Sequence, residues 1–199
     1  MKRFLLDTDI GADCDDAVAI AYLLGKQNEG RCTVAAITLS TAREYAPACA
    51  RVLTRQFGHG EIPLGILRGV SLACDAMDLY AEDIAKKNGA DHPTAEETPD
   101  AVTVMRKTLA GADAKTDIIA VGPQSNLRAL LDSPPDAASP LCGADLIRQK
   151  VGTLYIMGGR FVQDAGTPPR ADWNIAQDIG AARAVAARFP CRVVYCPYE

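Results

Sequence analysis

Short apolar runs alternate with longer amphipathic stretches along the whole chain. Continuous apolar runs bounded by Gly, Pro or acidic residues predict strands at 3–6, 32–39, 62–67, 116–121, 151–157 and 192–195. Apolar residues at helical spacing predict helices at 15–24, 45–57, 77–87, 99–109, 125–131 and 179–189. This repeated alternation favours an α/β fold, in which a mostly parallel sheet with a Rossmann-like core is flanked by helices.

The segments between these elements contain turn residues but no interdomain linker. Residues 132–143, rich in Pro, Ala and Ser, predict a surface loop, and a long loop is predicted from residue 158 to residue 174. The chain shows no internal repeat, and its length suits one sizeable hydrophobic core. We therefore expect residues 1–199 to form a single domain.

Composition and charge narrow the classes of partner. Hydrophobic residues make up 48 % of the chain and charged residues 23 %, an ordinary globular balance. The formal net charge of -4 gives no basic footprint for nucleic acid or for an anionic membrane. No apolar run approaches the ~20 residues that span a bilayer, and the apolar stretch before Asp7 is too short for a signal-peptide core. We expect a cytoplasmic protein that binds a small neutral molecule or a metal cation.

The seven cysteines are scattered, and none forms a Cys-x-x-Cys pair. Only two histidines, His59 and His92, accompany them. This pattern argues against a zinc site and against a disulfide framework, and it is typical of reduced thiols in a cytosol.

Residues 7–16 form an acidic loop that reads Asp-Thr-Asp-Ile-Gly-Ala-Asp-Cys-Asp-Asp. So many like charges raise carboxylate pKa values unless a cation relieves them, and oxygen ligands around a flexible Gly point to calcium or magnesium. Capping of a helix accounts for one or two aspartates, but not for Asp7 and Asp9 at the end of a strand. An EF-hand fits poorly, because Val18 stands where its bidentate Glu belongs.

Two further loops are expected to meet the acidic loop. In parallel α/β sheets, ligands bind beyond the carboxyl ends of the strands. The Gly-Pro loop after Val121 and the Gly-Gly loop after Met157 fall at that same edge. The three loops should therefore converge in space.

Four motifs, in order and at suitable spacing, carry a family resemblance. Asp-x-Asp-x-Gly-x-Asp-x-Asp-Asp-Ala after the first strand resembles the signature of the inosine-uridine-type nucleoside hydrolases, in the variant with two extra residues before the Asp-Asp pair. The Gly-Pro-Gln-Ser-Asn-Leu turn at 122–127, Met-Gly-Gly at 157–159 and Ala-Asp-Trp-Asn-Ile at 171–175 resemble further elements of this family. The resemblance implies a nucleoside hydrolase-like fold and Ca²⁺-dependent cleavage of the N-glycosidic bond of ribonucleosides.

The resemblance also implies roles for the metal-site residues. Asp9 matches the aspartate that contacts the metal and acts as general base on the attacking water. Asp16 matches a bidentate metal ligand, and Ser125, where the family has Thr, would offer its main-chain carbonyl to the metal. Asp15 matches a carboxylate that holds the ribose hydroxyls, with Asp13 as a rival because of the insertion.

A second group of matches would line the ribose pocket: Met157, Asp172 and Asn174. Without the resemblance, simpler interpretations stand beside these roles. Met157 could be core packing, Asn174 a helix or turn cap, and Asp172 a solvated charge. Ser125 could merely cap the helix that follows it.

The chain departs from the family pattern in three places. Ser40 and Thr41 stand where the family usually has an Asn, and Gly166-Thr167 where it tends to have Gly-Asn. Family members also continue past Glu199 and supply a further aspartate to the metal from a late His-Asp-type element. We therefore expect weaker cation binding, and a fragment, a site completed by a partner and a degenerate paralogue all remain open.

Two other functions compete with hydrolysis. One is a metal- or nucleoside-binding remnant without turnover. The other is a haloacid-dehalogenase-type phosphatase, which also begins with a strand ending in Asp-x-Asp but has Thr or Val where this chain has Gly11. The sequence leaves base preference open, and the resemblance suggests a homo-oligomer.

Overall fold

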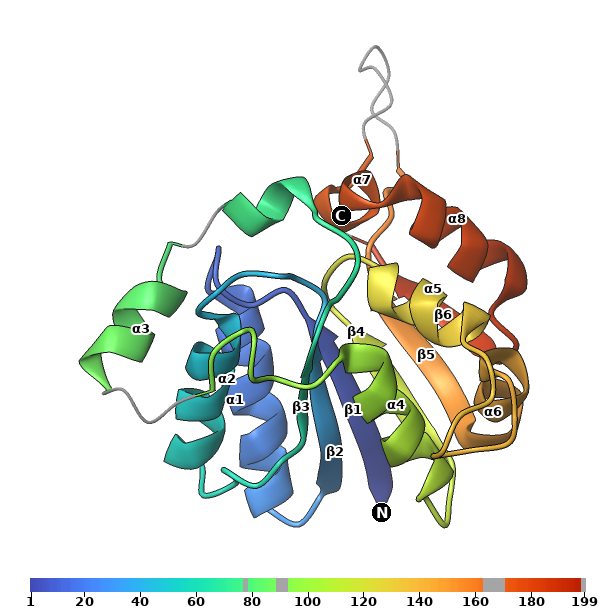
Figure 1. The fold of residues 1–199 in the computed structure, drawn as a ribbon, viewed down its shortest axis with the longest axis horizontal. Helices are drawn as coiled ribbons and strands as arrows, with labels where there is room; N and C mark the ends of the chain where they lie inside the picture. Colours follow the sequence, from blue (N-terminus) through green and yellow to red (C-terminus); the bar gives the residue numbers. More distant parts are fainter. Residues whose placement is uncertain (77–78, 89–92, 163–170, 198–199) are drawn as a thin grey trace.

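The computed structural model describes residues 1–76, 79–88, 93–162 and 171–197 (Figure 1). Its strands form one six-stranded sheet in the order β3-β2-β1-β4-β5-β6, and every neighbouring pair is parallel. The strands are β1 (Lys2–Thr8), β2 (Cys32–Leu39), β3 (Leu64–Ile66), β4 (Thr116–Ala120), β5 (Val151–Met157) and β6 (Arg192–Cys196). The predicted α/β class with a mostly parallel sheet is confirmed.

Helices cover both faces of this sheet, as Figure 1 shows for α1 and α2 on one side and α4 to α6 on the other. The α-helices are α1 (Asp15–Asn28), α2 (Ala46–Gln56), α3 (Ala81–Lys87), α4 (Ala101–Ala110), α5 (Ser125–Asp132), α6 (Gly143–Lys150), α7 (Trp173–Gln177) and α8 (Ile179–Arg188). A short 3-10 helix spans Ala73–Ala76. Among the described residues, no helix is both long and apolar enough to cross a membrane.

Two hydrophobic clusters hold the layers together. Side chains alternate between the faces of a strand, so Leu5 packs with α4, α5, α6 and α8, whereas Leu6 packs with α1 and α2. Both leucines are fully buried, because β1 lies in the middle of the sheet. Such two-sided burial explains why the strands read as continuous apolar runs.

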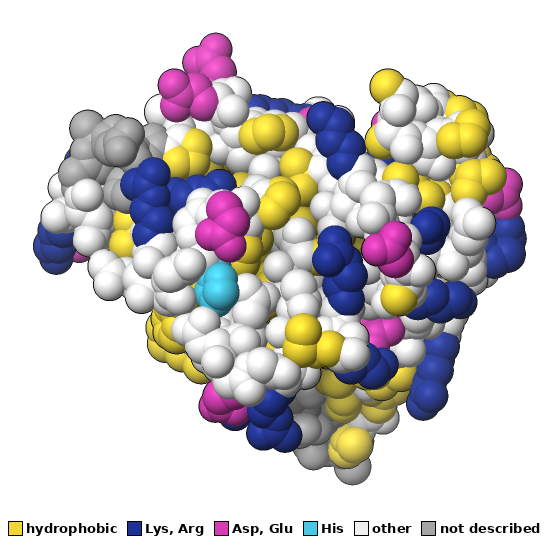
Figure 2. All heavy atoms as spheres, turned by 90° about the horizontal axis from the view of Figure 1, so that it is seen from below, with side chains coloured by type: hydrophobic (Ala, Val, Ile, Leu, Met, Phe, Trp, Pro, Cys, Tyr) yellow, Lys and Arg dark blue, Asp and Glu magenta, His cyan; other side chains and the backbone are white. Residues whose placement is uncertain are grey.

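The face at the amino ends of the strands carries mixed charge. Figure 2 shows Lys and Arg side chains there among Asp and Glu side chains. This face therefore presents both signs of charge.

Most predicted elements agree with the structure, and the differences are local. β2 and β5 have the predicted bounds, while α1 continues past Gly25 to Asn28. The predicted helix 77–87 begins only at Ala81, and residues 77–78 lie outside the described part of the chain.

Two short helices were not predicted. Among the side chains of α6, only Leu146 and Ile147 are deeply buried. Two apolar positions are too few to show a helical period in the sequence. The loop predicted to reach residue 174 is wrong at its end, because Asp172 caps α7, which starts at Trp173.

Candidate functional site

A pocket of about 860 Å³ lies at the carboxyl edge of the sheet. Its walls come from the acidic loop and the start of α1, from the ends of β4 and β5, and from α7. Six of the seven predicted site residues line it: Asp9, Asp15, Asp16, Met157, Asp172 and Asn174. The three loops that the sequence placed at this edge therefore do converge.

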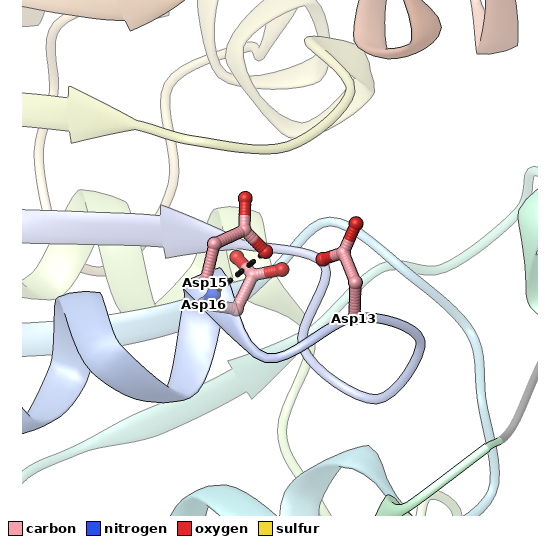
Figure 3. A group of neighbouring side chains, drawn as sticks. All are labelled: Asp13, Asp15 and Asp16. Carbon is pink, nitrogen blue, oxygen red and sulfur yellow. Dashed lines mark hydrogen bonds between the residues drawn. The ribbon is translucent and has the colours of Figure 1, made fainter.

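Three aspartates of the acidic loop point their carboxylates at one another (Figure 3). Asp13, Asp15 and Asp16 each offer one oxygen atom, and these atoms all lie within 4.8 Å of one another. Asp15 and Asp16 open α1, where the helix dipole favours negative charge. Asp16 is buried and accepts a hydrogen bond from the Thr8 hydroxyl at the end of β1.

Asp9 enters the pocket from the other side of the loop and is only 7 % exposed. It packs against Gly122, where an added Cβ would lie 2.6 Å from Asp9 Oδ1 and 2.4 Å from Ser40 Oγ. The Gly-Pro loop therefore needs a glycine at position 122, because any side chain there would collide with Asp9 and Ser40. Ser40, one of the two residues that stand where the family usually has an Asn, approaches the same point beside Gly122 as Asp9 Oδ1.

Burial and crowding raise the pKa values of these carboxyls. For Asp16, burial is the largest cause and the charge of Asp9 adds to it. Burial likewise raises the pKa of Asp9, while the positive charge of Arg43 opposes the rise. The pKa of Asp13 is raised chiefly by its hydrogen bond with Asp15 and then by burial. The pKa values of Asp9, Asp13 and Asp16 are thus raised in the predicted direction, but burial contributes more than like charge for Asp9 and Asp16.

This donor set fits a hard divalent cation. The ligand atoms are carboxylate oxygens, the groups that Ca²⁺ and Mg²⁺ prefer, and a bound dication would favour their charged forms. Among the described residues, the carboxylates whose oxygens meet within 4.8 Å belong to Asp13, Asp15 and Asp16, whereas the family resemblance selected Asp9, Asp16 and the main-chain carbonyl of Ser125. The resemblance and the geometry therefore share Asp16.

The opposite wall is built from the segment around α7. Asp172 Oδ1 accepts a hydrogen bond from Ile175 N at 2.8 Å, and Asp172 Oδ2 accepts one from Gly159 N at 2.8 Å. Asp172 is thus half-buried and fixed at the helix start, which excludes the simpler interpretation of a solvated charge. Asn174 Nδ2 donates to the Val121 and Met157 carbonyls and lies 3.3 Å from Met157 Sδ.

Ser125 is the predicted site residue that does not line the pocket. It is 4 % exposed at the first position of α5, and its hydroxyl donates to Asp178 Oδ2 at 2.7 Å. Its predicted role concerns the main-chain carbonyl and stays a prediction. Two other features, the Gly166-Thr167 departure and His92, lie outside the described residues.

Sequence reasoning missed several residues at the pocket. Trp173 and Leu79 line it and are more than half exposed, and Arg160 adds a positive charge to the walls. Behind the acidic loop, Arg43 is buried and its guanidinium donates to the main-chain oxygens of Asp9 and Ile10. A single Arg in the loop after a strand leaves no periodic signal, so the sequence pattern could not reveal it.

Comparison with known proteins gives a consistent set of matches. Residues 4–199 match the family model described as inosine-uridine preferring nucleoside hydrolase. A pyrimidine-specific ribonucleoside hydrolase, RihA, of Citrobacter koseri is 31 % identical over 191 residues, which is 91 % of this chain and 55 % of that protein. RihA of Escherichia coli O81 is 29 % identical over 190 residues, with the same coverage. The chain spans about half the length of these curated relatives.

Solved structures show the same fold at lower identity. The inosine-uridine preferring nucleoside hydrolase of Bacillus anthracis superposes with a TM-score of 0.73 at 19 % identity, over 100 % of this chain and 65 % of that one. The type III effector XopQ, solved with adenosine diphosphate ribose, gives 0.71 at 23 % identity, over 98 % and 56 %. A purine-preferring ribonucleoside hydrolase of Gardnerella vaginalis gives 0.67 at 21 % identity, over 98 % and 60 %.

Proposed function

Because this chain belongs to the inosine-uridine preferring nucleoside hydrolase family, we propose that it hydrolyses the N-glycosidic bond of ribonucleosides, giving ribose and free base, with Ca²⁺ as its cofactor. The observation that supports this proposal is the composition of one pocket. Crowded carboxylates lie on one wall, and Met157, Asp172 and Asn174 lie on the other. We further propose that residues 1–199 form a single domain, and that Asp9, Asp16 and the Ser125 carbonyl would hold the cation.

The proposed chemistry assigns each residue a step. When bound, Ca²⁺ supplies polarisation of a water molecule and a fixed anchor for the ribose diol. Asp9 accepts a proton from the water while the water oxygen attacks the anomeric carbon. The bond from that carbon to the base breaks at the same time. The base departs with the bonding electron pair and takes up a proton from the surrounding water. The positive charge that develops on the sugar is stabilised by the neighbouring carboxylates.

Substrate binding falls to the remaining residues. Asp15 holds the ribose hydroxyls, with Asp13 as the rival for that role, since both carboxylates lie in the same cluster. Met157, Asp172 and Asn174 line the ribose. The curated relatives are named as pyrimidine-specific, whereas one structural neighbour is named as purine-preferring, so both base classes belong in the assay. The homo-oligomer and the cytoplasmic location stay predictions.

The test is release of ribose from inosine and from uridine by the purified 199-residue protein, in Ca²⁺ and in chelator. We expect Ca²⁺-dependent release that falls about 100-fold or more in Asp9→Asn, the usual loss for a general base. The matched control is Asp117→Asn, a buried aspartate outside the pocket that accepts a hydrogen bond from Thr153 N at 2.9 Å. This control should lose stability but keep turnover.

Three other results would overturn the proposal. Cation binding without ribose release would identify a binding protein rather than a hydrolase. Release that is unaffected by chelator would remove Ca²⁺ from the mechanism. Hydrolysis of a chromogenic phosphate ester without ribose release would favour the phosphatase, an alternative that the family match over residues 4–199 opposes.

A further inference from the structure

Arg43 is one of the two bulkiest fully buried side chains of the described chain, together with Arg106. It lies in the segment between β2 and α2, and only 2 % of it is exposed. A buried guanidinium is costly unless its donors are satisfied and its charge is balanced. Its position beside the acidic loop therefore calls for a physical reason.

Two hydrogen bonds join the Arg43 guanidinium to the backbone of that loop. Its Nη1 atom donates to the main-chain oxygen of Asp9 and lies 3.4 Å from that of Ile10. Hydrogen bonds from a charged donor are roughly twice as strong as neutral ones. Arg43 thus binds the backbone just after β1, at the point where the chain places Asp9 in the pocket.

A second segment holds the next residue of the loop. The main-chain oxygen of Gly11 accepts hydrogen bonds from Leu79 N at 3.1 Å and Tyr80 N at 3.2 Å. The carbonyls of residues 9, 10 and 11 are therefore all bonded to parts of the chain outside the loop. These hydrogen bonds hold the loop through its main-chain oxygens and do not use its carboxylates.

The segment that carries Arg43 is itself anchored. Asp75 Oδ1 accepts hydrogen bonds from Thr41 Oγ1 at 2.7 Å and from Ala42 N at 2.9 Å, and Arg43 N donates to Thr41 Oγ1 at 3.3 Å. Asp75 Oδ2 accepts a further one from Leu72 N at 2.8 Å. The backbone on which Arg43 sits is therefore fixed by hydrogen bonds, and a side chain that positions a site needs such support.

We propose that Arg43 is a positioning residue that holds the acidic loop in its cation-accepting form before a cation arrives. The proposal rests on the proposed function only in taking a divalent cation as the ligand of this loop. A loop ordered in advance loses less conformational freedom on binding, so the cation binds more tightly. The fixed positive charge also offsets part of the repulsion among the crowded carboxylates.

Arg43→Lys and Arg43→Met test this role, with Arg106→Met as the matched control. Arg106 is equally buried, at 2 % exposure, but its guanidinium pairs with Asp136 and donates to Ser133 Oγ and to the main-chain oxygens of Ser139 and Leu141, away from the acidic loop. Hydrogen exchange of the amides of residues 9–14 is measured in chelator, and the Kd for Ca²⁺ is measured by calorimetry.

We expect both Arg43 variants to exchange these amides at least several-fold faster, and to bind Ca²⁺ about 10-fold more weakly, as the loss of one charged hydrogen bond implies. Arg43→Lys keeps the charge but not the forked geometry, so it should be the milder of the two. Arg106→Met should change exchange near residues 133–142 and leave the Kd for Ca²⁺ unchanged.

The charge of Arg43 alone predicts a different pattern. If Arg43 acted only as a like charge beside the cation, Arg43→Met would bind Ca²⁺ more tightly and Arg43→Lys would bind it unchanged, and either result would overturn the proposal. Should Arg43→Met fail to fold, Arg43→Lys decides. If the unsubstituted protein binds no Ca²⁺, the proposed function fails, and exchange of residues 9–14 that is unchanged in the Arg43 variants would overturn the positioning role separately.

Discussion

The side-chain amide of Asn174 lies 2.8 Å from the main-chain oxygen of Val121, and this hydrogen bond joins the start of α7 to the end of β4. The same amide reaches the Met157 carbonyl at the end of β5. Asn174 therefore ties together the two strand ends that form one wall of the pocket. The shape of this wall depends on a side chain that enters from a later segment.

Replacing Asn174 by Ala should damage the pocket more than the fold. Two partly buried carbonyls lose a donor, which costs roughly 1–2 kcal/mol of unfolding free energy. Ribose release should fall at least about 10-fold because Met157 loses the side chain that contacts both its carbonyl and its sulfur. The control is Asn28→Ala, which removes a similar bond to the Phe57 carbonyl on the exposed surface. Equal losses of activity in both variants would contradict this role.

Gly122→Ala should disable the acidic side of the pocket. The new Cβ would lie 2.6 Å from Asp9 Oδ1 and 2.9 Å from Asp9 N, so the carboxylate must move. Overpacking of this kind costs about 1–3 kcal/mol, and we expect turnover to be nearly abolished. Gly25→Ala in α1 is the control, because nothing lies within 4 Å of its Cβ and Ala favours the helix. A Gly122→Ala protein with normal turnover would contradict the placement of Asp9.

The stability of the metal-free protein should fall as pH rises. Burial raises the pKa of Asp7 from 3.8 to about 7 and also raises the pKa values of Asp9 and Asp16. Between the unfolded pKa of 3.8 and the folded pKa of about 7, Asp7 binds a proton in the folded chain but loses it in the unfolded chain. Raising the pH through this range therefore favours unfolding. Denaturant titrations in chelator, from about pH 5 to about pH 7.5, should show a decreasing free energy of unfolding.

Added Ca²⁺ should oppose this decrease, because a bound dication favours the charged carboxylates. A free energy of unfolding that rises over the same range in chelator would show that these carboxyls are not buried in their protonated forms.

Asp178 links Ser125 to α8, and its loss should affect the cation site. Its Oδ1 atom caps α8 by accepting from Ala181 N at 2.8 Å, while Oδ2 accepts from the Ser125 hydroxyl. Asp178→Ala should cost about 1 kcal/mol as a lost N-cap and should also weaken Ca²⁺ binding. Asp100→Ala removes the N-cap of α4 alone and should cost similar stability with an unchanged Kd. Identical Kd values in both variants would argue against the Ser125 carbonyl as a ligand.

The central part of the fold could be predicted from the sequence because burial imposes a simple pattern. β2 is buried on both faces along nearly its whole length, whereas β5 alternates buried with half-buried residues, and both segments have the bounds that the sequence predicted. α6 and α7 are short and leave few apolar positions, so no period marked them. For Asp172 a solvated charge stood as the alternative to a place in the ribose pocket. In the structure one oxygen caps α7 by accepting from Ile175 N, and the other accepts from Gly159 N just after β5, a contact that no local pattern could reveal.

The part of the candidate site that comes from one short segment could be predicted from the sequence. Asp9, Asp13, Asp15 and Asp16 follow one another within a single loop, and their crowding follows from their spacing. Arg43 comes from a different strand connection, and only the pairing of β1 with β2 brings it to the acidic loop. Contacts of this kind are set by the tertiary structure and leave no local mark in the sequence.

β1 is the first of the six strands to be synthesised, yet it pairs with β2 on one side and with β4 on the other. A growing chain can therefore form the β3-β2-β1 half of the sheet, with the acidic loop and Arg43 in place, while the edge of β1 that pairs with β4 is still open. The opposite wall of the pocket must wait until β5 and α7 have left the ribosome. During translation, the protein should thus gain its carboxylate cluster well before it gains a pocket that can hold a sugar.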